Sequence, residues 1–194
     1  MPDTRTGRSP LRRVSAQDRE RRRWDRRAGL APERWTIADS RQWVCSRATG
    51  SVLEVCCGTG LNLHHYPDHV LLTALDLNPG MLSVARGRSV VSRTMSLLQA
   101  DATQLPFATA SFDSVVCTLA LCEFRDRRAV LAEMYRMLRP GGRLLLLDHA
   151  QWRWPMRGRP VTLAVDVGFT PHRCERLRLG LIERVEARKP EVGG

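Results

Sequence analysis

Residues 52–60 read VLEVCCGTG, an apolar run that passes directly into a turn of small residues. The apolar start predicts a buried β-strand. Gly58 and Gly60 allow the backbone to turn sharply and to lie close to a ligand, because no Cβ stands in the way. A Gly-x-Gly turn by itself is equally compatible with a structural bend, so residues at later strand ends have to decide between a bend and a binding site.

Short apolar runs alternate with helical patterns after Gly50. They lie at 52–57, 71–75, 95–99, 114–119 and 144–147. Strands separated by helices predict βαβ units in a parallel sheet. Two last strands, 173–179 and 182–189, are separated by only two residues and predict an antiparallel hairpin. The expected fold is therefore α/β, a Rossmann-like doubly wound and mostly parallel seven-stranded sheet that ends in this hairpin.

Local signals also predict two helices. A short helix is expected over 61–66, ended by Pro67. Asp126 is a suitable N-cap for a second helix that carries Val130, Met134 and Met137 on one face. The Pro-Gly-Gly sequence at 140–142 is expected to end that helix before the LLLL run.

Charge is concentrated at one end of the chain. The 194 residues carry a formal net charge of +11, Lys189 is the only lysine, and many arginines lie in the first 27 residues. Clustered arginines bind phosphate well, yet they are also typical of a solvated tail, which we favour. No apolar run approaches the roughly 20 residues that cross a bilayer, so a transmembrane segment is not expected.

The organisation follows from these patterns. Residues 1–17 are expected to be a disordered basic tail, and 18–194 a single domain. The domain divides into N-terminal helices (18–48), a binding core (51–149), a connecting segment (150–170) and the terminal hairpin (171–190). Its six cysteines form no CxxC pair and no spacing suited to zinc, so no metal site is expected. Free cysteines are typical of a reducing compartment, so a cytoplasmic location is expected.

Further polar residues stand at the ends of the next two predicted strands. Asp76, followed by Leu77, ends LLTALD, and Asp101-Ala102 follows the third strand. Ligands of open α/β sheets bind beyond the carboxyl ends of the strands, and an acidic residue after the second strand accepts the hydroxyl protons of a ribose. Asp76 would alternatively cap the helix that begins near Pro79. Together with the glycine turn, these positions favour a nucleoside cofactor.

Four segments carry a family resemblance: VLEVCCGTG, ALDLNPGML (74–82), QADATQLPFATASFDSVVCTLALCEF (99–124) and RMLRPGGRLLLLDH (136–149). They resemble class I S-adenosylmethionine-dependent methyltransferases of the small-molecule type related to the ubiquinone and menaquinone enzymes. The resemblance implies S-adenosyl-L-methionine as cofactor. By position it implies Glu54 near the methionine amino group, Gly58 and Gly60 around the methionine and sugar, Asp76 at the ribose, Asp101 and Ala102 at the adenine, and the Leu119 backbone near the methionine end. Leu77, next to Asp76, is also expected among the cofactor-binding residues.

Two features depart from the family pattern. Cys56 stands where the family has its first glycine, so it is included among the cofactor-binding positions as a small replacement. The segment 150–170 is shorter than the helical insertion that commonly roofs the substrate pocket. The first departure concerns the turn that binds the cofactor, and the second concerns the pocket that binds the methyl acceptor.

The predicted function is methyl transfer to a small molecule that is quinone-like, lipid-like or a secondary metabolite. A nucleic-acid (rRNA or tRNA) methyltransferase and a non-catalytic S-adenosylmethionine-binding protein stay open as alternatives. Against the former, no Asn-Pro-Pro-Tyr-like segment follows the fourth strand. A nicotinamide-binding oxidoreductase is disfavoured, because Leu63 stands where a dinucleotide-binding protein has its third glycine. The candidate general bases near strand ends are Glu123 and His149 and, less favoured, His64, His65 and His172. None of them is assigned a catalytic role, and the sequence does not identify the methyl acceptor or the oligomeric state.

Overall fold

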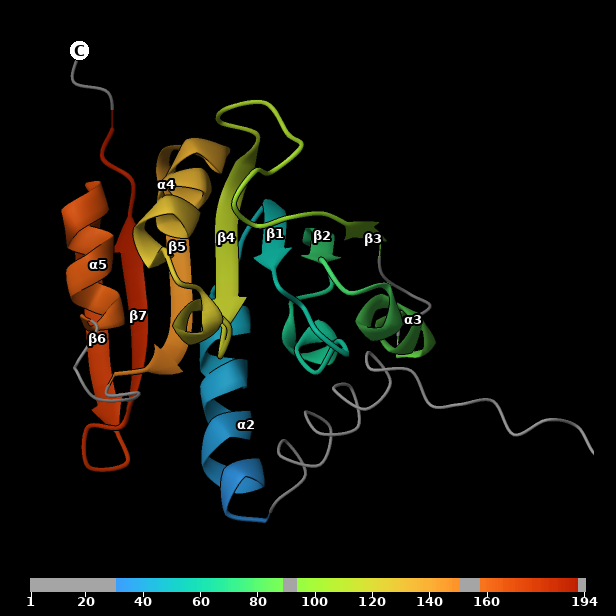
Figure 1. Ribbon diagram of the computed structural model, residues 1–194, viewed down its shortest axis with the longest axis horizontal. Helices are drawn as coiled ribbons and strands as arrows, with labels where there is room; N and C mark the ends of the chain where they lie inside the picture. Colours follow the sequence, from blue (N-terminus) through green and yellow to red (C-terminus); the bar gives the residue numbers. More distant parts are fainter. Residues whose placement is uncertain (1–30, 89–93, 151–157, 192–194) are drawn as a thin grey trace, which may run out of the picture.

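Seven strands form one sheet in the computed structural model, which describes residues 31–88, 94–150 and 158–191. The strands are β1 (Ser51–Val55), β2 (Leu71–Asp76), β3 (Met95–Gln99), β4 (Phe112–Thr118), β5 (Leu138–His149), β6 (Thr170–Leu177) and β7 (Ile182–Arg188). Their order across the sheet is β3-β2-β1-β4-β5-β7-β6, as Figure 1 shows. Strands β1 to β5 pair in parallel, and β7 is antiparallel to both β5 and β6. The predicted fold class and terminal hairpin are confirmed.

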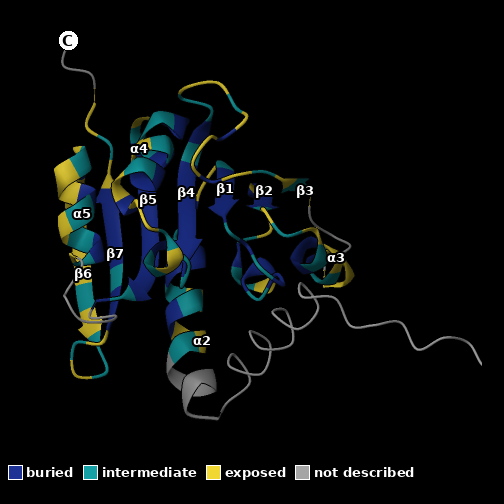
Figure 2. Cartoon of the chain, in the orientation of Figure 1, coloured by how far each residue is buried: buried dark blue, intermediate teal, exposed yellow. Residues whose placement is uncertain are grey.

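Helices cover both faces of this sheet. They are α2 (Ala31–Cys45), α3 (Pro79–Gly87), α4 (Arg127–Met137) and α5 (Pro160–Val167), with single 3-10 turns η1 (Leu63–His65) and η2 (Leu121–Glu123). Successive strand residues point to opposite faces. Leu53 therefore belongs to the core beneath α4 and α5, and Val52 to the core beneath α2 and α3. Because both faces are covered, the central strands are almost entirely buried (Figure 2).

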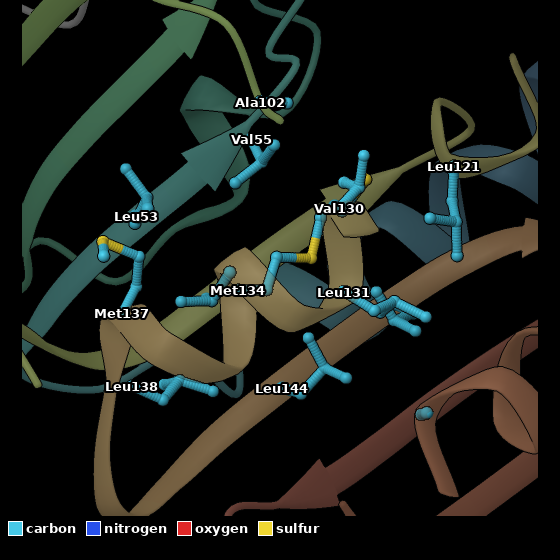
Figure 3. Close-up of a cluster of buried hydrophobic side chains, with 14 of the residues drawn as sticks. Leu53, Val55, Ala102, Leu121, Val130, Leu131, Met134, Met137, Leu138 and Leu144 are labelled. Carbon is cyan, nitrogen blue, oxygen red and sulfur yellow. The ribbon is translucent and has the colours of Figure 1, made fainter. Parts of the chain in front are cut away.

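The helix α4 shows how the sequence pattern becomes packing. The Asp126 side chain accepts a hydrogen bond from the Ala129 amide, as predicted for the N-cap. Val130, Met134 and Met137 are fully buried, and in Figure 3 they gather between α4 and the strands of the sheet. The helix ends at Met137, and β5 begins at the next residue rather than after the Pro-Gly-Gly sequence.

One predicted helix is wrong. The segment 61–66 contains only the 3-10 turn η1 and no α-helix. Six residues between the glycine turn and Pro67 form too few helical hydrogen bonds to offset the free-energy cost of helix nucleation. The proline also lacks the N–H group that would continue the hydrogen-bond pattern. The tail 1–17, the first part of the predicted N-terminal helices, and residues 151–157 lie outside the described residues.

The strand order places a switch point between β1 and β4. From β1 the chain moves to β2 and β3 on one side, and then returns to β4 on the other side of β1. A crevice opens at such a reversal, beyond the carboxyl ends of the two strands. Cys56 follows β1 and Leu119 follows β4, so both predicted site residues lie at this switch point. None of the helices in the described ranges has the length and apolar composition of a membrane span.

Candidate functional site

The glycine turn is attached to the end of β2 through its backbone. The Cys57 amide donates to the Leu75 carbonyl (2.8 Å), and the Gly58 amide donates to Asp76 Oδ2 (2.9 Å). The other oxygen of Asp76 accepts from the Asn78 amide (2.9 Å). The alternative role of Asp76 as the cap of α3 is wrong, because the side chain of Asn78 caps that helix. Asp76 instead joins the first strand end to the second.

Two non-glycine residues at the switch point adopt left-handed backbone conformations. They are Cys56, with φ of 59°, and Leu119, with φ of 53°. This conformation is strained for residues with a Cβ, and such strain is typical of functional sites. The Leu119 amide donates to the Leu147 carbonyl (2.7 Å), which holds the residue in place. Cys56 therefore occupies a position whose backbone favours glycine, as the resemblance implied.

The two glycines of the turn differ in their surroundings. Both have positive φ, 55° at Gly58 and 79° at Gly60. A Cβ on Gly58 would meet nothing within 4 Å, whereas one on Gly60 would lie 2.7 Å from Leu63 and 3.0 Å from Ala85. Gly60 is thus required for packing, and Gly58 borders open space.

Glu54 lies beneath the turn in a polar network within the otherwise apolar core. Its Oε1 accepts from Asn62 Nδ2 (2.7 Å), which is also 2.8 Å from Thr118 Oγ1. From α2, Arg41 donates to Asn62 Oδ1 (2.6 Å) and to Thr118 Oγ1 (2.9 Å). Sequence reasoning missed Asn62, which binds Glu54 directly, and Thr118 and Arg41, which bind Asn62. The signal for Thr118 was a polar residue at the end of an apolar strand.

The second oxygen of Glu54 is an unsatisfied acceptor. Oε2 is buried and has no hydrogen-bond partner in the described part of the chain. Burial raises the pKa of Glu54 to about 7, and the neighbouring Asn62, Tyr66 and Arg41 only partly offset this effect. A buried acceptor without a donor is costly. A cation placed beside this carboxylate would therefore be stabilised.

The predicted site residues surround Cys56 with negative charge. Burial is the main reason that the pKa of the Cys56 thiol is raised to about 12. The remaining contribution comes from nearby carboxylates, in decreasing order those of Asp76, Glu54, Asp101 and Asp148. The structure thus brings together acidic residues from the ends of β1, β2 and β5 and from the loop after β3. The site is acidic although the chain has a net charge of +11.

The remaining predicted residues lie along the same edge of the sheet. Asp101 is exposed, and its Oδ1 accepts from the amide (2.8 Å) and hydroxyl (2.7 Å) of Thr103, which lower the pKa of Asp101. Ala102 is buried in the core beneath α4, while Leu77 is 61% exposed. An exposed leucine beside Asp76 offers an apolar contact at the edge of the site.

Comparison with known proteins relates the sequence and the fold of this chain to methyltransferases. Residues 53–146 match a family model described as a methyltransferase domain. This range runs from β1 into β5 and includes both strands that flank the switch point. Residues 53–146 of this chain are therefore similar to a methyltransferase domain. The predicted resemblance to class I methyltransferases is confirmed.

Several methyltransferases resemble this domain. Thiol S-methyltransferase TMT1A of Homo sapiens is 36% identical over 104 residues, which is 51% of this chain and 42% of that protein. Demethylmenaquinone methyltransferase of Deinococcus radiodurans is 39% identical over 101 residues, 50% of this chain and 42% of that protein. The chain thus aligns with less than half the length of either relative.

A solved structure shares the fold over nearly the whole chain. N-methyltransferase NodS of Bradyrhizobium japonicum, in complex with S-adenosyl-L-homocysteine, superposes with a TM-score of 0.72 and 22% identity, covering 91% of this chain and 100% of that one. Glu123 in η2 and His149 at the end of β5 lie at the same edge of the sheet as Leu119. The helix α5 packs against α4, β6 and β7.

Proposed function

We propose that the methyltransferase domain binds S-adenosyl-L-methionine beyond the carboxyl ends of β1 to β4 and transfers its methyl group to a small molecule. The observation that carries the proposal is the acidic site around Cys56, with the unsatisfied Oε2 of Glu54 beneath an open glycine turn. S-adenosylmethionine carries a sulfonium and an ammonium charge, so both its cations are stabilised by this site.

Each site residue has a role in this proposal. Glu54 accepts from the methionine ammonium group, and the open space at Gly58 leaves room for the cofactor next to the backbone. Asp76 accepts from the ribose hydroxyls while its existing bonds to two amides fix its orientation. The adenine lies among Leu77, Asp101 and Ala102, and the methionine end lies near the backbone of Leu119 and Cys56, with Gly60 supporting the turn through its packing.

Methyl transfer at this site depends mainly on positioning. The acceptor atom attacks the methyl group in line with the departing sulfur, so the domain has to hold the two reactants in the correct geometry. No covalent enzyme intermediate is needed. A base is required only when the acceptor still carries its proton, and His149 and Glu123 stand at the edge from which an acceptor would approach.

The acceptor class follows from the relatives. Those named above are a thiol methyltransferase and a demethylmenaquinone methyltransferase, so we propose thiols and quinone-like compounds as the first acceptors to test. An acidic site disfavours nucleic acid, because phosphate is repelled by the same carboxylates that attract the cofactor. All six cysteines are free, which supports a reducing, cytoplasmic location.

Calorimetry and a turnover assay test the proposal. The purified chain should bind S-adenosylmethionine and S-adenosylhomocysteine but not NADH. If the chain binds neither S-adenosylmethionine nor S-adenosylhomocysteine, the proposal is overturned. Release of S-adenosylhomocysteine should then depend on an added thiol or quinol, whereas binding without turnover on any acceptor of a broad metabolite extract would favour the non-catalytic alternative.

A further inference from the structure

A second group of polar side chains lies at the ends of β4 and β5. Cys122 is in the turn η2, and Asp148 and His149 are the last residues of β5. The Cys122 sulfur is 3.4 Å from His149 Nδ1, which is 3.5 Å from Asp148 Oδ1. One ligand atom from each residue lies within 4.8 Å of the other two. None of the three is among the residues proposed to hold the cofactor.

These distances fit a tetrahedral metal ion. Zinc binds thiolate sulfur at about 2.3 Å and imidazole nitrogen at about 2.0 Å. With tetrahedral angles, a sulfur and a nitrogen bound to the same ion are therefore about 3.5 Å apart. The sulfur and nitrogen of Cys122 and His149 already have this separation. A thiolate, an imidazole and a carboxylate together favour zinc over magnesium or calcium, which prefer oxygen ligands.

Backbone hydrogen bonds already orient the carboxylate of this group. Asp148 Oδ2 accepts from the Cys122 amide (3.2 Å), and Oδ1 accepts from the His149 amide (2.6 Å). Asp148 is 2% exposed, whereas the side chain of His149 is 24% exposed. Glu123 adds a carboxylate oxygen 3.9 Å from the Cys122 sulfur. The carboxylate of the group is thus oriented by backbone hydrogen bonds on the buried side, and the imidazole of His149 is partly exposed to solvent.

We propose that Cys122, Asp148 and His149 form a binding site for one zinc ion. Three protein ligands leave the fourth position to a water molecule or another small ligand, as in zinc sites that are not purely structural. The sequence spacing did not suggest this site because Cys122 and His149 are 27 residues apart. They meet only because β4 and β5 pair in parallel and end at the same edge.

Metal binding by the whole chain tests the proposal directly. The protein is stripped with a chelator and titrated with zinc chloride alone, and the bound metal is then measured by elemental analysis after dialysis. We expect one zinc ion per chain in the wild type. In Cys122→Ser and in His149→Ala, zinc affinity should fall at least about tenfold, because each loses a direct ligand. A cobalt-substituted sample should show thiolate-to-cobalt absorption that Cys122→Ser abolishes.

Matched controls come from exposed residues outside the group. Cys174→Ser and His172→Ala remove the same residue types from β6, and both should keep the bound zinc and the cobalt spectrum. Thermal unfolding and S-adenosylhomocysteine binding confirm that every variant is folded. Absence of zinc from the wild type overturns the proposal, as does zinc retained in both group variants or lost equally in the controls.

Discussion

Replacement of Glu54 by glutamine should stabilise the protein and weaken cofactor binding at the same time. The pKa of Glu54 is raised from 4.5 to about 7 by burial. The folded chain therefore holds a proton on Glu54 at pH values where the unfolded chain has lost it. The free energy of unfolding consequently falls as the pH rises from about 4.5 to about 7, and this shift amounts to about 3 kcal/mol.

Glutamine has nearly the same shape but no charge, so Glu54→Gln removes this cost. At pH 5 the wild type and the variant should differ by less than about 1 kcal/mol, and at pH 8 the variant should be about 2 to 3 kcal/mol more stable. Urea unfolding at both pH values measures the difference. Glu191→Gln, an exposed carboxylate, is the control and should show no such dependence.

Cofactor binding provides the second measurement on Glu54→Gln. Loss of the carboxylate removes a hydrogen bond to a charged group, worth about 1.5 to 3 kcal/mol, so affinity for S-adenosylhomocysteine should fall about 10- to 100-fold. In the wild type, binding near pH 7 should release a proton, detectable by calorimetry in buffers of different ionisation enthalpy. A variant that is no more stable at pH 8, or that binds as tightly as the wild type, would refute the reasoning.

The other predictions concern the turn and Asp76. Asp76→Ala should weaken S-adenosylhomocysteine binding by about 1 to 3 kcal/mol in calorimetry, while the exposed control Asp68→Ala leaves it unchanged. Cys56→Gly should be at least as stable as the wild type in urea unfolding, whereas Cys56→Val should lose about 1 to 3 kcal/mol, because a β-branched residue resists a left-handed backbone. Gly60→Ala should destabilise the fold more than Gly58→Ala, since only the former meets neighbouring atoms. Gly58→Ala should mainly reduce cofactor affinity, and equal unfolding midpoints for the two alanine variants would contradict this distinction.

Much of the sheet and part of the site could be predicted from the sequence. The central parallel strands were recognisable because a strand buried on both faces is a continuous apolar run, and the hairpin because only two residues separate its strands; both signals are local. Asp76 and Asp101 were recognisable because they directly follow such runs. The short helix at 61–66 was wrong since local propensity there yields to the glycine turn and Pro67.

The sequence by itself therefore determined the α/β sheet, the glycine turn and the acidic residues at its strand ends. Only the tertiary structure decided which residues complete the site. Arg41 reaches Thr118 across 77 residues, and Cys122 meets His149 across 27. Such contacts depend on which strands become neighbours and which helix covers which face. Those choices are made by the packing of the whole core, and no local spacing encodes them.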